Sequence, residues 1–128
     1  MNSEIAIGIV LKDSDVLIVK RKQSEGDLQW QFPGGVIENN ESELQAVVRE
    51  IYEETGCEID VVKPLGKRLH PYTKKIISYW ICQYRNGNLV ISDDDLEDVK
   101  WINKTDLLQY FTTSVYEPVL SYLGLLNP

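Results

Sequence analysis

The pattern of apolar and polar positions predicts short β-strands in the first part of the chain. Isoleucines alternate with small residues and run into further apolar residues over residues 5–11, which predicts a strand. A polar turn and a second apolar run at 16–20 complete a predicted hairpin. Residues 22–28 are polar and are expected to form a loop. Residues 30–32 are expected to be extended, because Phe32 precedes a proline.

The clearest helix is predicted over residues 41–55. Asn40 is the expected N-cap, with Glu43 as its partner in a capping box. Gly56 stands where a helix ends in a left-handed residue. Side chains with helical spacing predict one buried stripe, made of Leu44, Val47, Val48, Ile51 and Thr55.

The second half of the chain predicts further strands and two closing helices. The strands are expected at residues 59–65, 76–84 and 99–102. The helices are expected at 105–111 and 115–125, with Pro118 in the first turn of the second. Strands interleaved with a few helices predict an α/β fold in which helices cover both faces of a mixed sheet. With 128 residues, the chain is expected to form a single domain, residues 1–128.

Composition and charge argue against several classes of protein. The chain has 13 Lys and Arg against 20 Asp and Glu, a net charge of −7, so we expect no binding of bulk nucleic acid through positive charge. No apolar run approaches the roughly 18 residues of a membrane span, and the N-terminus lacks a basic leader, so a cytoplasmic location without membrane contact is expected. Cys57, Cys82 and the single histidine, His70, form no zinc pattern, and we expect both cysteines to be reduced.

The predicted helix carries an acidic face. Glu50, Glu53 and Glu54 are three and four residues apart, so their carboxylates occupy adjoining positions. Such a face is commonly a solvated surface. Clustered carboxylates also suit Mg²⁺ or Mn²⁺ held together with the phosphates of a substrate. The spacing alone leaves both interpretations open.

A longer pattern of residues surrounds this helix. Gly35, Glu41, Arg49-Glu50-Ile51, Glu53-Glu54 and Gly56-Cys57 fit G-x5-E-x7-R-E-U-x-E-E-x-G-U, where U is an apolar residue. This pattern resembles the Nudix box of MutT-like hydrolases. The likeness covers residues 35–57 and extends more loosely to Phe32-Pro33-Gly34 before the box and Trp101 after an acidic run. It implies the Nudix fold and metal-dependent hydrolysis of a nucleoside diphosphate linked to another group.

The resemblance also implies a role for each residue of the box. The ligands of Mg²⁺ or Mn²⁺ would be Glu50, Glu53, Glu54 and the carbonyl oxygen of Gly35. Arg49 would orient a box carboxylate, and Glu41 would brace the loop or bind metal through water. The ions would neutralise charge on the phosphates and lower the pKa of the attacking water.

Candidates for the remaining catalytic and substrate contacts lie inside and outside the box. The catalytic base is expected to be Glu53, or Asp95 or Glu97 in the acidic run 93–98. Arg21 resembles the basic residue that contacts substrate phosphates in the family, although Lys20 and Lys22 compete with it. The candidates for contact with a nucleobase are Trp30, Tyr72, Trp80 and Tyr116. Phe32 is assigned to the same substrate-binding set and is expected to pack beneath the glycine loop.

The expected function is hydrolysis of nucleoside triphosphates, including oxidised or non-canonical ones, to a monophosphate and pyrophosphate. Tyr116-Glu117-Pro118-Val119 is similar to the C-terminal helix of enzymes that act on 8-oxo-dGTP. Asparagine is common there at the position of Tyr116, and a phenol lacks the paired donor and acceptor of an amide.

Other substrates and one non-enzymatic class stay open. The enzymatic alternatives are dinucleoside polyphosphates, RNA 5′ ends and ADP-ribose, and the alternative class is a nucleotide-binding module without catalysis. The expected partner is in each case a nucleotide with a diphosphate linkage. Members of the family are often dimers, so the resemblance allows a homodimer.

Overall fold

The computed structural model describes residues 4–25, 28–71, 74–112 and 114–126. Its strands are β1 (Ile5–Lys12), β2 (Asp15–Glu25), β3 (Leu28–Gln31), β4 (Gly34–Val36), β5 (Glu58–Leu69), β6 (Ile76–Asn86) and β7 (Leu96–Asn103). Its helices are α1 (Glu43–Thr55), α2 (Leu107–Tyr110), which follows a 3₁₀ turn, and α3 (Glu117–Leu123). No helix of the described residues is long and apolar enough to cross a membrane.

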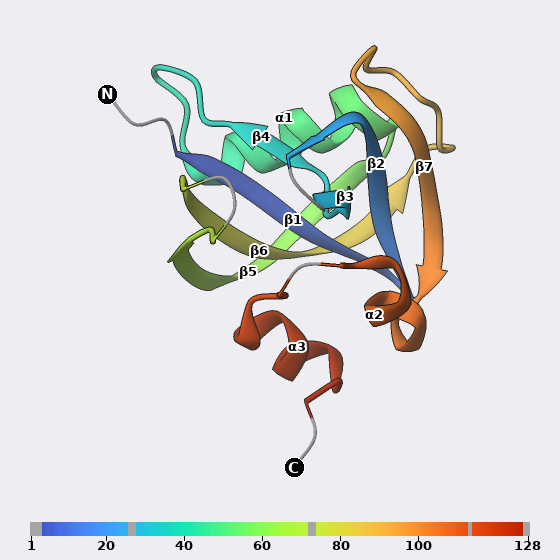
Figure 1. The fold of residues 1–128 in the computed structure, drawn as a ribbon. Helices are drawn as coiled ribbons and strands as arrows, with labels where there is room; N and C mark the ends of the chain where they lie inside the picture. The colour runs from blue at the N-terminus through green and yellow to red at the C-terminus, as the bar shows by residue number, and fades with distance from the viewer. Residues whose placement is uncertain (1–3, 26–27, 72–73, 113, 127–128) are drawn as a thin grey trace.

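The strands form one mixed sheet with β1 near its centre. The main path runs β3-β2-β1-β6-β5, with β4 added to β1 and β7 added to β2. β1 runs parallel to β6 and antiparallel to β2 and β4 (Figure 1). β4 therefore joins the sheet beside the first half of β1, and residues 37–42 connect it to α1. The hairpin predicted from the first two apolar runs is confirmed.

Helices cover both faces of the sheet, as the sequence predicts (Figure 1). On one face, α1 packs in a cluster that includes Ala6, Val10, Ala46, Val47 and Ile51. On the other face, α2 and α3 pack in a cluster that includes Ile9, Ile81, Leu107, Val119 and Leu123. Cys57 and Cys82 are buried free thiols in the first cluster.

The predicted start of the long helix is wrong by two residues. Ser42 is the N-cap of α1, and its Oγ accepts a hydrogen bond from the Gln45 backbone N–H at 3.1 Å, while Gln45 Oε1 accepts one from the Ser42 N–H at 2.9 Å. Asn40 has a left-handed φ of 67°, whereas an N-cap residue is extended. The predicted end is confirmed, because Gly56 has a φ of 79°.

The buried face of α1 also differs from the prediction. Leu44 and Val48 are 45% and 38% exposed, although both were expected in the buried stripe. The residues that α1 buries are Ala46, Val47, Ile51, Glu54 and Thr55. The buried face of α1 is thus rotated toward the carboxylate of Glu54. The hydrogen-bond partners of Glu54, described with the site, explain this rotation.

Several predicted boundaries are wrong elsewhere. Residues 22–25, expected in a loop, continue β2. The edge strand β5 extends to Leu69 through Pro64, because shifts of register with β6 absorb the irregular residues. The closing helices are shorter than predicted: residues 104–106 form a 3₁₀ turn before α2, and α3 begins only at Glu117. The placement of Pro118 in the first turn is confirmed.

Candidate functional site

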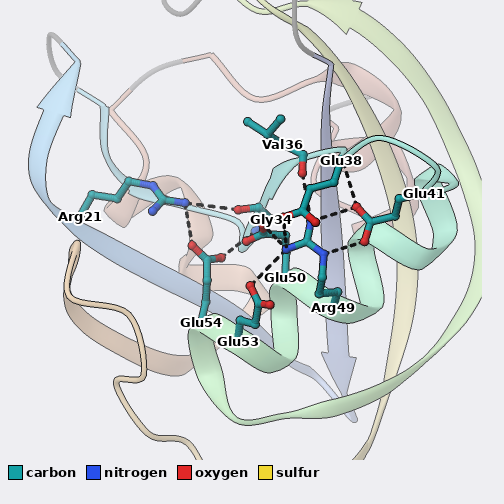
Figure 2. Close-up of polar contacts among 9 residues, drawn as sticks. All are labelled: Arg21, Gly34, Val36, Glu38, Glu41, Arg49, Glu50, Glu53 and Glu54. Carbon is teal, nitrogen blue, oxygen red and sulfur yellow. Dashed lines mark hydrogen bonds and ion pairs between the residues drawn. The ribbon is translucent and has the colours of Figure 1, made fainter.

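Two glycines of β4 lie against carboxylates of α1, and Figure 2 shows the first of them, Gly34. The Gly34 N–H donates to Glu54 Oε1 at 2.9 Å. At Gly35, a Cβ would lie 2.5 Å from Glu50 Cδ and 2.6 Å from Glu50 Oε2. The absence of that Cβ lets the Glu50 carboxylate approach the main chain of β4, so the loop and the helix form one oxygen-rich surface.

Glu54 is an ionisable side chain in the interior, with a relative exposure of 1%. Its Oε2 accepts from Arg21 Nη2 at 2.9 Å, opposite the bond from Gly34. Burial raises the pKa of the Glu54 carboxyl, while the Arg21 charge and the Gly34 N–H act in the opposite direction. Arg21 further donates to the Gly34 carbonyl and to Gln31 Oε1, both at 3.4 Å. These bonds connect β2, β3, β4 and α1, and they explain the rotation of the buried helix face.

Arg49 holds two further carboxylates of α1 and that of Glu41, which lies before the helix (Figure 2). Its Nε and Nη2 donate to the two oxygens of Glu41 at 2.6 and 2.9 Å, and its Nη1 donates to Glu50 at 2.7 Å and Glu53 at 3.1 Å. The Nη2 also donates to the Val36 carbonyl at 3.1 Å. The hydrogen bonds from Arg49 lower the pKa of Glu41 to about 2, and they raise the pKa of Arg49 itself. One guanidinium thus compensates several negative charges and ties them to β4.

The predicted metal ligands lie together, but two arginines hold them. Among the described residues, no three Asp, Glu, His or Cys side chains are grouped as a metal-binding cluster. Two features nevertheless fit a divalent cation. The donor set consists of oxygens, which Mg²⁺ prefers, and the missing Cβ of Gly35 lets the Glu50 carboxylate lie directly against the backbone of β4. The Glu53 side chain is 57% exposed and can reach a ligand in solvent.

A cavity of about 390 Å³ lies next to the glycines, on the face of the sheet opposite α1. At the glycine end its lining includes Arg21, Gln31, Gly34, Gly35 and Asp95. The rest of the cavity is largely aromatic and basic, with Phe32, Arg68, Tyr79, Phe111 and Tyr116. A polar site on β4 therefore continues into an aromatic pocket.

Four of the residues assigned from the sequence to catalysis or substrate binding line this cavity. They are Arg21, Phe32, Asp95 and Tyr116. Asp95 reaches the site because β7 pairs with β2: the Lys22 N–H donates to the Asp95 carbonyl at 2.8 Å. Asp95 also shares a shallow depression with Glu53. Of the basic candidates on β2, Arg21 is the one that the described cavity contains.

Other assigned residues are not brought to the cavity. Glu97 forms an ion pair with Lys20 at 3.2 Å on the surface. Trp80 packs against the cluster on the α1 face of the sheet, and Trp30 makes an edge contact with Tyr110 instead of lining the cavity. Tyr72 lies outside the described residues.

Sequence reasoning missed the residues that define the far end of the cavity. Tyr79 alternates with Ile77 and Ile81 along the strand predicted at 76–84, and this inward position was a usable signal. Arg68 lies beyond the predicted end of the preceding strand, so no local pattern placed it on the sheet. Phe111 was assigned only to a closing helix.

Comparison with known protein families gives one match over nearly the whole chain. The model of the NUDIX domain family matches residues 2–123. The chain is 28% identical over 108 residues to the CTP pyrophosphohydrolase of Escherichia coli, covering 84% of this chain and 80% of the relative. It is 25% identical over 120 residues to an RNA pyrophosphohydrolase of Campylobacter jejuni, covering 79% of this chain and 77% of the relative.

Solved structures share the fold at low sequence identity. A NUDIX hydrolase from Nitrosomonas europaea superposes with a TM-score of 0.81 at 17% identity, covering 96% of this chain and 70% of that one. A MutT NUDIX hydrolase from Burkholderia pseudomallei superposes with a TM-score of 0.71 at 19% identity, covering 99% of both chains. The match therefore extends from the box to the arrangement of the sheet and helices.

Proposed function

Because the chain belongs to the NUDIX family, we propose that it is a metal-dependent pyrophosphohydrolase that cleaves nucleoside triphosphates to a monophosphate and pyrophosphate. One observation carries this proposal: the glycines of β4 contact carboxylates of α1 and also line a cavity of about 390 Å³ with aromatic walls. Such a cavity suits a nucleoside whose phosphates lie at the site.

The ligands of Mg²⁺ or Mn²⁺ in this proposal are Glu50, Glu53, Glu54 and the Gly35 carbonyl. When bound, the ions would stabilise charge on the phosphates and lower the pKa of the attacking water. Each carboxylate oxygen offers two acceptor positions, so the existing bonds from Arg21 and Arg49 are compatible with this role.

The chain's own residues supply positioning around these ligands. Arg49 fixes the direction of Glu50 and Glu53, and the missing side chain of Gly35 keeps the backbone accessible. Arg21 anchors Glu54 and also lines the cavity, so its charge lies close to the expected position of the phosphates. In this proposal the base that takes a proton from water is Glu53 on the helix or Asp95 on the facing loop, and both residues line one depression.

A second candidate substrate is the 5′ end of RNA. The relative from Campylobacter jejuni is named an RNA pyrophosphohydrolase, and it covers a similar share of this chain to the CTP pyrophosphohydrolase. The reaction again breaks a phosphoric anhydride bond, so the same residues would serve. Only the group beyond the first nucleotide differs.

A panel of substrates tests both candidates. The panel contains the four ribonucleoside triphosphates, their deoxy forms, 8-oxo-dGTP, ADP-ribose, diadenosine polyphosphates and triphosphorylated RNA, each with Mg²⁺. We expect turnover of nucleoside triphosphates, with a monophosphate and pyrophosphate identified by chromatography. Release of orthophosphate alone, or no turnover of any compound, would contradict the proposal.

A pair of glutamine substitutions tests the site. Glu53→Gln is expected to lower kcat by about 100-fold or more, because it removes an ionised oxygen from the reacting centre. Glu58→Gln is the matched control, because Glu58 is an exposed residue of β5 that pairs with Arg85. Equal activity of the two variants would contradict a role for Glu53 in catalysis.

A further inference from the structure

Two tyrosines from distant parts of the chain form one wall of the cavity. The rings of Tyr79 on β6 and Tyr116 before α3 stack with centroids 4.7 Å apart and planes inclined by 26°. Tyr116 Oη donates to the Lys67 carbonyl at 3.2 Å. Gly66 has a φ of 121°, and a Cβ there would lie 2.8 Å from the same oxygen. The backbone of β5 thus binds the hydroxyl group of Tyr116, so it is mainly the aromatic ring surface that is left to contact a ligand.

Arg68 places a guanidinium at this wall. Its Cζ lies 5.7 Å from the ring centroid of Tyr79 and 5.5 Å from that of Tyr116. Its Nε donates to Tyr79 Oη at 3.0 Å, and its Nη2 donates to the Ser114 carbonyl at 3.1 Å. These bonds use two of the five N–H donors of a guanidinium and fix its plane. Arg68 also lines the cavity, so a planar group of donors faces its ligand space.

The register of the sheet sets the distance from this wall to the glycines. Ile5 on β1 pairs with Val36 on one side and with Ile77 on the other, and Ile77 pairs with Arg68. Arg68 is therefore three strands away from β4, or about 14 Å at the usual spacing of strands. An extended nucleotide with its phosphates at β4 would reach the tyrosine wall with its base.

We propose that Arg68 selects the nucleobase and favours bases that present two adjacent hydrogen-bond acceptors. Guanine offers O6 and N7, and cytosine offers O2 and N3. In adenine the amino group separates the acceptors, and in uracil an N–H separates the two carbonyls. A guanidinium only donates hydrogen bonds. It can therefore bind guanine or cytosine through two N–H groups, but adenine or uracil through only one. The position of the phosphates in this inference rests on the proposed function.

Binding of nucleoside monophosphates measures the base contact without turnover. Calorimetric titration of the full chain is expected to give dissociation constants for GMP and CMP about tenfold lower than those for AMP and UMP, or about 1.4 kcal/mol. In Arg68→Gln this ratio falls below about twofold, because the paired donors are lost. Arg68→Lys keeps the positive charge but lacks the planar pair of N–H donors, so the ratio of dissociation constants is expected to fall in the same way.

One variant controls for general effects of charge. Arg85→Gln removes an arginine on β6 that pairs with Glu58 and Asp60, and it leaves all four affinities unchanged. A preference that changes equally in Arg85→Gln would overturn the assignment to Arg68.

The wild-type protein gives a test that does not depend on the folding of a variant. Inosine monophosphate keeps O6 and N7 but lacks the 2-amino group, so it should bind like GMP. If it binds as weakly as AMP, the inference is wrong. A folded Arg68→Gln that keeps the preference overturns the inference as well, even if triphosphates are hydrolysed. Conversely, selective binding of monophosphates without hydrolysis of any triphosphate supports the role of Arg68 and contradicts the proposed function.

Discussion

A missing side chain shapes the centre of the candidate site. Because a Cβ at Gly35 would lie 2.5 Å from Glu50 Cδ, Gly35→Ala must displace this carboxylate or the backbone of β4. The φ of Gly35 is not left-handed, so alanine is tolerated by the main chain. We expect kcat to fall by about 100-fold, as for a misplacement of about 1 Å. Steady-state kinetics and a thermal melt check this, and a folded variant with wild-type kcat would contradict it.

The contact between Glu41 and Arg49 predicts a specific dependence of stability on pH. The bonds from Arg49 lower the pKa of Glu41 from its ordinary value of 4.5 to about 2, so folding favours the ionised form. This contribution to stability is complete above pH 4.5 and is lost as the pH falls toward 2.

Substitution of Glu41 isolates this contribution. Glu41→Gln lacks the ionisable group, so the difference in unfolding free energy between wild type and variant is expected to shrink from pH 6 to pH 2. Urea unfolding at several pH values measures this difference. A difference that stays constant over this range would show that the ion pair does not stabilise the fold.

Single residues show what the sequence could and could not predict about the site. Gly35, Glu50 and Arg49 were assigned through their spacing in the box, and the structure places them in one cluster. The partnership of Arg21 with Glu54 was not foreseen, because the two are 33 residues apart and a glutamate is normally counted as exposed. Pairing of this kind depends on the tertiary fold, which no local pattern contains.

At the level of elements, the cap of α1 gives a measurable contribution to stability. Ser42→Ala removes the acceptor for the Gln45 N–H, and we expect a loss of about 1 kcal/mol in the free energy of unfolding. Ser121→Ala is the matched control, because Ser121 is an exposed residue within α3, where alanine favours the helix. Chemical unfolding measures both. An equal effect of the two substitutions would contradict the role of Ser42.

The elements were predicted best where local patterns agree with tertiary contacts. The strands near residues 5–11 and 76–84 and the helix end at Gly56 follow from alternation and a left-handed glycine. The buried stripe of α1 was predicted correctly at Val47, Ile51 and Thr55. It was wrong at Leu44 and Val48, which have helical spacing but face solvent, while the buried pair of Glu54 with Arg21 turns the helix. Hydrophobicity alone could not indicate that a charged residue replaces an apolar one in the interior.

On the scale of the whole molecule, the sheet connects the two ends of the candidate site. One row of paired residues crosses four strands from Val36 through Ile5 and Ile77 to Arg68. The segment before α3 packs against the sheet near this row, because the ring of Tyr116 stacks on that of Tyr79. The cavity therefore depends on the packing of the C-terminal segment against strands from the first two-thirds of the chain, and its shape could not be read from any single segment.

Binding of a divalent cation at the proposed ligands Glu50, Glu53 and Glu54 predicts that the cation stabilises the whole fold, which has a net charge of −7. A ligand that binds only the folded state at 100 times its Kd adds about 2.7 kcal/mol, which corresponds to a rise in Tm of about 10 °C for a domain of this size. We expect MgCl₂ to produce this shift in a thermal melt, and NaCl at equal ionic strength to produce a smaller one, because sodium only screens the charges. Glu50→Gln should reduce the shift caused by magnesium, whereas the control Glu58→Gln should preserve it. Equal shifts with the two salts, or an undiminished shift in Glu50→Gln, would show that the carboxylates of α1 are not the binding site and that general screening of charge explains the stabilisation.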